Sequence, residues 1–313
     1  MAQNEPLLTV ENLKQYFHQA KHNTVKAVDG VSFELYAGET FGLVGESGSG
    51  KSTIGRSIIR LYKPTAGKIT FAGKDISARL SSETQQFLRM NMQMIFQDPL
   101  ASLNPRKTIG ESIGEGLDIH RLYTSKAERK EKIQHILKKV GLLPAYIDRY
   151  PHQFSGGQRQ RVGIARALVM NPRLIIADEC ISALDVSVQA QVVNLMKDIQ
   201  KETGMAYLFI AHDLSMVKYI SDRIGVLHYG HLVEFGTTEE IFANPVHPYT
   251  KSLLSAIPRV NLELERKRTV FTYDYATSGI DYTKGKKQHI SGDHYVLATN
   301  AEYAAWTSRH IPA

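Results

Sequence analysis

An apolar segment that runs directly into a glycine-rich loop constrains the fold of this chain more than any other feature. The residues Gly45-Glu-Ser-Gly-Ser-Gly50-Lys51-Ser52 follow the apolar segment Phe41–Val44 and fit the pattern of glycine, four residues, then Gly-Lys-Ser/Thr. Glycines let backbone amides turn inward around phosphate oxygens, and a helix that begins at Ser52 adds its positive N-terminal end. The sequence therefore predicts a phosphate-binding loop between a buried strand and a helix.

Each residue type in this loop has a chemical reason to be there. Lys51 can reach the β- and γ-phosphates of a nucleotide, and the Ser52 hydroxyl can ligate Mg²⁺. A glycine turn that binds nothing is the plain alternative, and the position between a strand and a helix argues against it. The candidate nucleotide-binding residues of the loop are Gly45, Glu46, Ser47, Gly48, Ser49, Gly50, Lys51, Ser52 and Thr53.

A second apolar segment, Leu174–Ala177, ends in the two acids Asp178 and Glu179. A strand of this kind places its carboxylates at the edge of a parallel sheet, where ligands collect. Asp178 can then hold Mg²⁺ through water, and Glu179 can polarise the attacking water as a general base. Acids at strand ends are also common where nothing binds, so this motif indicates a nucleotide site only because a phosphate loop precedes it.

Strand-like and helix-like segments alternate along most of the chain, which indicates a parallel sheet with crossover helices. The expected strands are several short ones within 7–35, and others at 41–44, 68–72, 94–96, 174–177 and 207–211. The expected helices lie at 52–61, within 98–172 (126–139 among them), at 186–203 and at 214–220. The sequence thus predicts an α/β fold with a core at 1–97 and 168–244, a helical insertion at 98–167 and an extension at 245–313.

The extension has its own pattern. A loop with Pro245 and Tyr249 leads into a short helix that ends near Ala256. Beyond it, Phe271, Tyr273 and Tyr275 alternate with other residues, and 295–298 is apolar, so strands are expected in both places.

The segment Phe154-Ser-Gly-Gly-Gln158 precedes a predicted amphipathic helix. A serine hydroxyl and bare glycine amides at a helix start make a second anion site, although Ser155 is equally suited to capping the helix. In company with the phosphate loop and the paired acids, Ser155, Gly156, Gly157 and Gln158 resemble the signature sequence of ABC ATPases.

The same resemblance assigns further residues. Gln97 resembles the Q-loop glutamine, which ligates Mg²⁺ and senses the transmembrane partner. Ser182–Asp185 resembles the D-loop, and His212 resembles the switch histidine that contacts the γ-phosphate, although a lone histidine is more often structural. Tyr16 lies where the family places an aromatic ring on adenine, with Phe17 beside it as an alternative.

The resemblance covers about residues 7–244 and implies an ABC-type phosphate-loop NTPase core with N-terminal antiparallel strands. It also implies a mechanism, in which ATP and Mg²⁺ bind between the phosphate loop of one subunit and the signature sequence of a second. Catalytic roles fall to Glu179, His212 and Gln97, and Mg²⁺ would be held by Ser52, Gln97 and Asp178. The family commonly has Leu at 154 and Pro-Thr at 180–181, where this chain has Phe154, Cys180 and Ile181. None of these removes a catalytic group, so an active ATPase is expected.

The segment Asn244–Pro258 resembles the region that marks ATPases of oligopeptide, dipeptide and nickel importers, as do Asp98–Pro105 and Asp185–Gln191. Phe271–Trp306 resembles the tail of the F-type ATPase subunits of oligopeptide permeases from Gram-positive bacteria. The resemblance implies import of oligopeptides, with a dipeptide, nickel or metal-chelate importer as the alternative. A further alternative is that these segments only cap the core.

The implied partners are a second homologous ATPase in a heterodimer, two transmembrane permease subunits and an extracellular peptide-binding protein. The loop Asp98–Arg106, which contains Leu100 and Leu103, joins the core to the helical insertion. A permease helix is expected to dock there.

Composition limits the other functional classes. The chain has 38 Lys and Arg against 31 Asp and Glu, a formal net charge of +7, but the basic residues are scattered, so no nucleic-acid partner is expected. Cys180 is the single cysteine, which suits a reducing compartment. No apolar run approaches the ~18 residues of a membrane span, so something else must hold the chain if it works at a membrane. The resemblance to importer ATPases implies the cytoplasmic face of a bacterial cell membrane, where permease subunits would hold it. A DNA-repair ATPase would need long heptad repeats and a translation factor two cassettes, and neither pattern is present.

Overall fold

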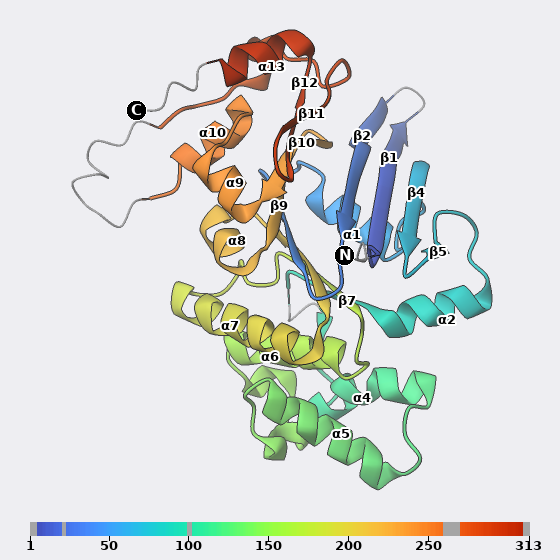
Figure 1. Cartoon of the computed structure of the whole chain (residues 1–313). Coiled ribbons are helices and arrows are strands. Elements are labelled where there is room, and N and C mark those ends of the chain that lie inside the picture. The colour runs from blue at the N-terminus through green and yellow to red at the C-terminus, as the bar shows by residue number, and fades with distance from the viewer. Residues whose placement is uncertain (1–4, 21–22, 99–101, 259–269, 309–313) are drawn as a thin grey trace. The chain divides into compact units, whose positions relative to one another are not determined.

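The computed structural model describes residues 5–20, 23–98, 102–258 and 270–308, and its elements alternate as an α/β fold (Figure 1). The chain separates into two compact units. The first contains Tyr36–Glu39 and Ala78–Phe209, and the second contains Pro6–Leu35, Thr40–Ser77 and the chain from Ile210 onward. The boundary falls inside strand β8. The predicted division into core, helical insertion and extension is a different one, and it stays a prediction.

The first unit combines a group of helices with strands in the order β8-β7-β6. β7 pairs in parallel with β6, so that Met92 lies opposite Leu174 and Ile95 opposite Ala177. Every residue of β7 and β8 is buried, as is typical of parallel strands covered on both faces. The elements of this unit are α2 (Ser82–Asn91), β6 (Met92–Ile95), α4 (Ile109–His120), α5 (Lys126–Lys139), α6 (Gly156–Leu168), β7 (Leu174–Asp178), α7 (Val186–Thr203) and β8 (Ala206–Ala211), with 3₁₀ turns at Pro144–Asp148 and Pro151–Gln153.

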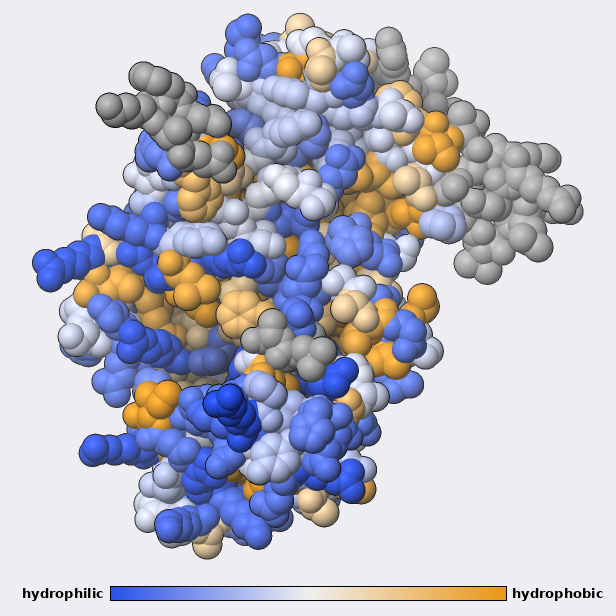
Figure 2. Space-filling view, turned by 180° about the vertical axis from the view of Figure 1, so that it is seen from behind, coloured by the Kyte–Doolittle hydropathy of each residue, from blue (hydrophilic) through white to orange (hydrophobic). Residues whose placement is uncertain are grey.

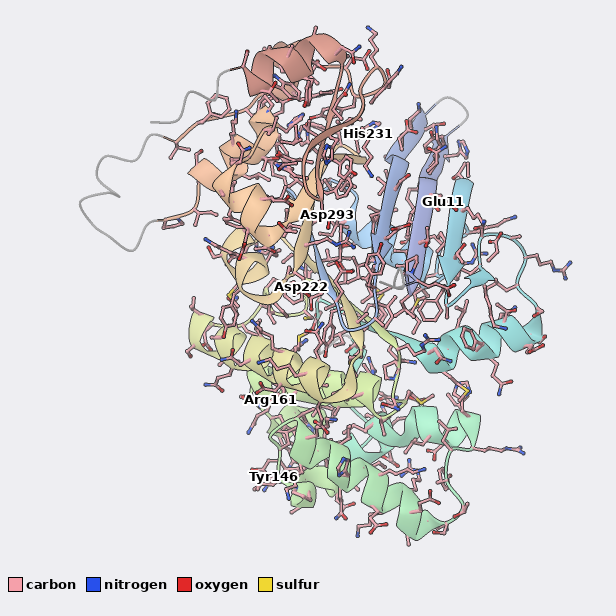
Figure 3. All side chains as sticks on the ribbon, viewed as in Figure 1. Glu11, Tyr146, Arg161, Asp222, His231 and Asp293 are labelled. Carbon is pink, nitrogen blue, oxygen red and sulfur yellow. The ribbon has the colours of Figure 1, made fainter. Side chains whose placement is uncertain are left out.

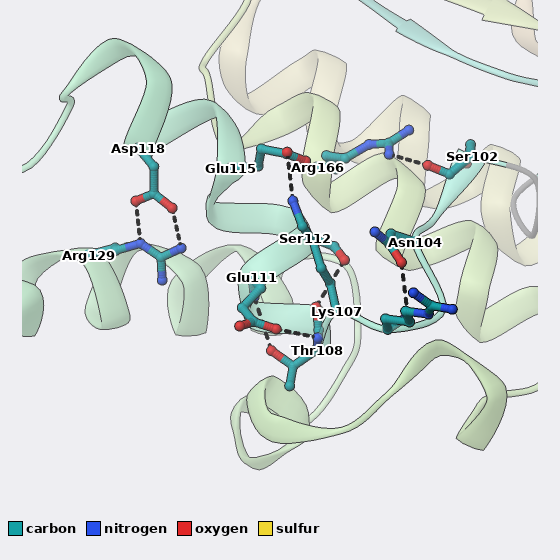
Figure 4. Close-up of polar contacts among 11 residues, drawn as sticks. Ser102, Asn104, Lys107, Thr108, Glu111, Ser112, Glu115, Asp118, Arg129 and Arg166 are labelled. Atoms are coloured by element: carbon teal, nitrogen blue, oxygen red, sulfur yellow. Dashed lines mark hydrogen bonds and ion pairs between the residues drawn. The ribbon is translucent and has the colours of Figure 1, made fainter.

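Capped helix starts and ion pairs hold the helical part of the first unit together (Figure 4). At the start of α4, Glu111 N donates to Thr108 Oγ1 (3.2 Å), and Thr108 N donates to Glu111 Oε2 (2.7 Å). Arg129 on α5 donates from Nε and Nη2 to the two carboxylate oxygens of Asp118 on α4, at 2.6 and 2.7 Å. This paired hydrogen bond lowers the pKa of Asp118 and raises that of Arg129.

The surface of this helical part is mostly hydrophilic on the face seen in Figure 2, where it forms the lower portion of the picture. Within the described ranges, no helix is both long and apolar enough to cross a membrane.

The second unit contains an antiparallel sheet in the order β2-β1-β4-β5, and strands in the order β11-β12-β10-β9-β3. Figure 1 shows β1, β2 and β4 side by side. In the other set, β3 runs parallel to β9 and the remaining pairs are antiparallel. The elements are β1 (Leu8–Ala20), β2 (Asn23–Leu35), β3 (Thr40–Val44), α1 (Lys51–Ile58), β4 (Ala66–Phe71), β5 (Lys74–Asp75), α8 (Leu214–Ile220), β9 (Arg223–His228), β10 (His231–Thr237), α9 (Thr238–Ala243), α10 (Pro248–Ser255), α12 (Tyr275–Ser278), β11 (Lys286–Ser291), β12 (His294–Ala298) and α13 (Asn300–Thr307).

The N-terminal segment differs from the several short strands that the sequence predicts. It forms two strands of 13 residues each, paired along their length, with register shifts between Val10 and Leu13 and between Gln15 and Tyr16. Asn12 has φ of 49° at the first shift. Such irregularities interrupt the alternation of apolar and polar residues, and a long strand then looks like short ones in the sequence.

The strand predicted around Phe271, Tyr273 and Tyr275 is wrong. The amide of Phe271 donates to Ser255 Oγ (2.9 Å) and that of Tyr273 donates to Ser252 Oγ (3.2 Å), so these amides bond to side chains rather than to a neighbouring strand. The chain then turns into the one-turn helix α12. The alternation of aromatic residues here reflects ring packing, whereas the strand expected at 295–298 is present in β12.

Candidate functional site

The glycine-rich loop lies in the second unit between β3 and α1, as the sequence predicts. All five residues of β3 are buried. The start of the strand is fixed by Asp222, whose Oδ2 accepts from Thr40 N (2.8 Å) and whose N–H donates to Thr40 O (2.9 Å) (Figure 3). The loop therefore starts from a firmly held strand.

The glycines of the loop adopt conformations that other residues rarely reach. Gly48 has φ of 80° and Gly50 has φ of 107°. A Cβ atom on Gly50 would lie 2.3 Å from Ala27 O, whereas one on Gly48 would meet nothing within 4 Å. The loop is thus packed on one side and open at Gly48. Gly50 is also the N-cap of α1 and supplies no side-chain cap, which suits a helix start that receives an anion.

The Lys51 side chain is buried beneath this loop, with 4% of its surface exposed. Its Nζ donates to Gly45 O (2.7 Å) and to Glu46 O (2.8 Å). The Glu46 amide in turn donates to the Tyr249 hydroxyl oxygen (2.9 Å). Tyr249 lies in the segment Asn244–Pro258, and the sequence does not connect it with the loop, because nothing in a sequence pattern links residues so far apart.

The predicted acids lie in the first unit at the end of β7. Asp178 is 2% exposed. Glu179 follows with φ of 48°, a left-handed conformation that is uncommon for a residue with a side chain. Gln97 Nε2 donates to Glu179 Oε2 (2.9 Å), so the structure brings these two candidates together. Backbone strain of this kind gathers at functional sites, where the surrounding structure holds it in place.

The candidate signature residues also lie in the first unit, at the start of α6. Gln158 N donates to Ser155 Oγ (3.3 Å) and Ser155 N donates to Gln158 Oε1 (3.0 Å), so Ser155 does cap the helix. A Cβ atom on Gly157 would lie 2.5 Å from Val188 Cγ1. Val188 N donates to Asp185 Oδ1 (3.0 Å) at the start of α7. The glycine therefore packs against the helix that follows the predicted D-loop, a contact that the sequence pattern does not reveal.

The two roles of Ser155, capping and anion binding, can be separated by substitution. Ser155→Ala is expected to lower the free energy of unfolding by about 1 kcal/mol, because the α6 cap is lost. Ser155→Asp keeps a capping oxygen but adds negative charge, so it should retain the stability and lose ATP hydrolysis. Chemical denaturation and ATPase assays of both variants are the measurements. Full activity in Ser155→Asp would show that Ser155 is a cap alone.

The remaining candidates occupy exposed or half-buried positions. His212 is exposed and follows β8, and it belongs to the second unit. The Tyr16 hydroxyl donates to Asp29 Oδ1 (2.6 Å), and the ring of Phe17 packs edge-on against Tyr62 with centroids 5.3 Å apart. Of the two aromatic candidates for an adenine contact, Phe17 is therefore the one engaged in ring packing.

The three departures from the family pattern are buried. Phe154 packs edge-on against Tyr146, labelled in Figure 3, with ring centroids 5.4 Å apart. Cys180 and Ile181 are 2% and 4% exposed. Burial raises the pKa of the Cys180 thiol to about 12, so it stays protonated and packs as an apolar side chain. None of the three takes the place of a group assigned to catalysis.

The predicted docking loop is described only in part. Leu100 lies outside the described residues. Leu103 is 4% exposed, so a substitution there would disturb packing within the first unit as well as any contact with a partner.

Two family models match the chain. The one described as "ABC transporter" matches residues 28–182, and the one described as "Oligopeptide/dipeptide transporter, C-terminal region" matches residues 233–276. The phosphate loop, the candidate signature and the paired acids all fall within the first match. His247, Pro248 and Tyr249 fall within the second.

Curated relatives match over nearly the whole length. The oligopeptide transport ATP-binding protein OppF of Bacillus subtilis is 56% identical, over 97% of this chain and 99% of its own length. The dipeptide transport ATP-binding protein DppF of Lactococcus lactis is 52% identical, over 96% of this chain and 97% of its own.

Solved structures show the same architecture. CbiO1 from Clostridium perfringens, part of the ABC transporter complex cbiONQ, has a TM-score of 0.67 at 28% identity, covering 76% of this chain and 91% of its own. A dimer of the ATP-binding cassette MJ0796 bound to ADP and Pi has a TM-score of 0.68 at 29% identity, covering 74% of this chain and 98% of its own.

Proposed function

This chain belongs to the ABC transporter family, and from that premise we propose that it is the ATP-hydrolysing subunit of an oligopeptide importer. One observation carries the proposal: the similarity to oligopeptide transport ATP-binding proteins runs through both the nucleotide-binding segment and the C-terminal region, over 97% of the chain. A DNA-repair or translation ATPase would account for the first segment and not for the second.

The roles of the residues follow from their surroundings. Lys51, buried beneath the loop, neutralises phosphate charge. Glu179 acts as the general base that orients the attacking water, and Gln97 holds one of its carboxylate oxygens through the 2.9 Å hydrogen bond. His212 is proposed to contact the γ-phosphate. The adenine would stack on Tyr16 or Phe17.

The donor set fits Mg²⁺. The Ser52 hydroxyl, the Asp178 carboxylate and the Gln97 amide oxygen are hard oxygen ligands, which this ion prefers. Among the described residues, no cluster of three or more acidic, histidine or cysteine side chains offers a complete metal site. Water and phosphate oxygens would fill the remaining positions around the ion. When bound, Mg²⁺ neutralises charge on the β- and γ-phosphates.

ATP would be enclosed in a dimer, between the phosphate loop of one subunit and Ser155–Gln158 of the other. We propose that the second subunit is a different, homologous ATPase. The support is the extension beyond Pro258, which resembles one of the two ATPases of peptide importers. Differing extensions can favour one pairing and obstruct the other.

The loop Asp98–Arg106, which joins the core to the helical insertion, is the proposed docking site of a permease helix. Substitution of Leu100 is expected to spare ATP binding and to uncouple hydrolysis from transport. Cross-links from this loop to a permease subunit in the assembled complex would support the placement, and cross-links from another surface alone would contradict it.

The chain would accordingly work at the inner face of a bacterial cell membrane, bound to two permease subunits. An extracellular peptide-binding protein would deliver the substrate, and no nucleic acid takes part.

Transport by the assembled complex tests the proposed function. Proteoliposomes that contain this chain, its partner ATPase and the two permeases are expected to take up a labelled oligopeptide when the binding protein is outside and Mg²⁺-ATP is at the ATPase side. Replacing ATP with ADP is the matched control. Labelled dipeptide and Ni²⁺ form the competing arms, because related proteins serve dipeptide transport. ATP-dependent uptake of Ni²⁺ alone, or ATP hydrolysis that no substrate or permease affects, would contradict the proposal.

A further inference from the structure

The His247-Pro248-Tyr249 segment starts α10, and each of its residues has a separate task there. His247 is the N-cap, with its Nδ1 accepting from Tyr249 N (3.0 Å). Burial lowers the pKa of His247 to about 3, so the ring is neutral and Nδ1 can accept. Pro248 occupies the first helical position, where its fixed φ suits a helix start. Tyr249 follows and carries its hydroxyl to the phosphate loop.

A buried carboxylate anchors the His247-Pro248-Tyr249 segment. Glu234 on β10 accepts from Val246 N at Oε1 (2.7 Å) and from His247 N at Oε2 (2.9 Å). His294 Nε2, from β12, lies 2.7 Å from Glu234 Oε1, and both side chains are fully buried. The middle of β10 and the start of β12 therefore fix where α10 begins. Because three partners share one carboxylate, the start of the helix has little freedom to move.

The ring of Tyr249 is enclosed by other rings. It stacks on His228, with centroids 3.9 Å apart, and meets Tyr273 edge-on at 5.9 Å. His228 Nδ1 lies 2.6 Å from the Tyr282 hydroxyl oxygen. Tyr249 is 1% exposed. A ring held this way can deliver its hydroxyl to a single place.

That place is one edge of the peptide unit between Gly45 and Glu46. The carbonyl oxygen of this unit accepts from Lys51 Nζ (2.7 Å), and its N–H donates to the Tyr249 hydroxyl oxygen (2.9 Å). The plane of the peptide is thus held from opposite edges, by the lysine that the phosphates require and by a tyrosine of the C-terminal region. Rotation of the plane would break both hydrogen bonds and withdraw a carbonyl that places the ammonium group.

We propose that Tyr249 is a positioning residue for ATP binding: its hydroxyl holds the Gly45–Glu46 peptide plane and thereby the phosphate loop and Lys51. This deepens the proposed function and rests on it. It also gives the His247-Pro248-Tyr249 segment a role in nucleotide binding, which is separate from any role in recognising peptides.

Tyr249→Phe in the full chain tests the proposal, because it keeps the ring and removes the hydroxyl. Hydrogen exchange in the absence of nucleotide should show the Glu46 amide protected in the unsubstituted protein and exchanging about three- to tenfold faster in the variant, as expected for one lost hydrogen bond. The dissociation constant of a fluorescent ATP analogue should rise by about the same factor. In the assembled transporter KM for ATP should rise while kcat stays unchanged, because positioning lost alike in ground and transition states changes KM alone.

Tyr273→Phe is the matched control. Its hydroxyl lies in the same group of rings, 3.3 Å from Ser278 Oγ and 3.4 Å from the Tyr282 hydroxyl oxygen, and neither of these partners belongs to the phosphate loop. It should leave exchange at Glu46 and nucleotide affinity unchanged.

Equal exchange and equal affinity in folded Tyr249→Phe would overturn the proposal, as would an unprotected Glu46 amide in the unsubstituted protein, which can be measured even if the variant fails to fold. A chain that binds no ATP would instead refute the proposed function, and the exchange of Glu46 would still report on the hydrogen bond.

Discussion

Glu179→Gln is expected to lower ATP turnover of the assembled transporter by about 10²–10⁴-fold, the range typical of losing a well-placed general base. The amide keeps the size of the side chain and can still bond to Gln97, so nucleotide binding should persist. Steady-state ATPase assays, with the partner ATPase substituted alike, are the measurement. Retention of more than half of the activity would remove Glu179 from the catalytic role.

A matched control is Glu83→Gln, which makes the same chemical change on an exposed residue in the first turn of α2. It should leave turnover unchanged.

The Glu179→Gln variant also tests the pairing, because a subunit that binds but does not hydrolyse ATP should accumulate in the closed dimer. Size measurement with Mg²⁺-ATP should show mostly monomer for the chain alone and dimer once the second ATPase is added, since association loses several kcal/mol of rigid-body freedom that only a complementary interface offsets. A stable homodimer of this chain alone would count against the heterodimer.

Lys51→Ala is expected to weaken ATP binding by about 30- to 5,000-fold, because truncating one partner of a buried, hydrogen-bonded charge pair costs about 2–5 kcal/mol. The variant also leaves the carbonyls of Gly45 and Glu46 without the donor that they share. Equilibrium binding of a fluorescent nucleotide is the measurement, with thermal unfolding as the check that the protein folds.

Lys68→Ala is the control for charge. Lys68 lies on β4 in the same unit as Lys51, and 56% of its side chain is exposed. Its Nζ lies 3.9 Å from Oε2 of Glu11, which is labelled on β1 in Figure 3. Its loss removes the same charge from an exposed ion pair, and such pairs contribute little to stability. Similar nucleotide affinities in the two variants would show that net charge, rather than the buried ammonium group, governs binding.

The helices that the sequence predicts best are those with signals at their ends. Helix α7 spans Val186–Thr203, as expected, because Asp185 caps its start and Gly204, with φ of 68°, ends it. Helix α8 likewise follows the cap Asp213. Such signals act over a few residues, so they are present in the sequence itself.

The prediction failed where a pattern had two explanations. Aromatic residues that alternate around Tyr273 fit a strand, but here the alternate rings of Tyr273 and Tyr275 surround His228, with centroids 5.7 Å from it in each case. Period-two spacing places side chains on one side of any extended segment, whether or not a neighbouring strand pairs with it. Which of the two occurs depends on what lies alongside, and that is decided by tertiary packing.

The sequence by itself determined the candidate motifs of this protein: the phosphate loop, the paired acids and the candidate signature residues are short and contiguous, and their residue types predict what they can bind. Tertiary structure alone decided how these motifs are held. Gln97 reaches Glu179 across 82 positions of the chain, and Tyr249 reaches Glu46 across 203. A sequence pattern records residue type and local spacing, whereas partners so far apart meet only because each unit packs its strands and helices in one arrangement, and it is that packing that aims a tyrosine of the C-terminal region at the loop.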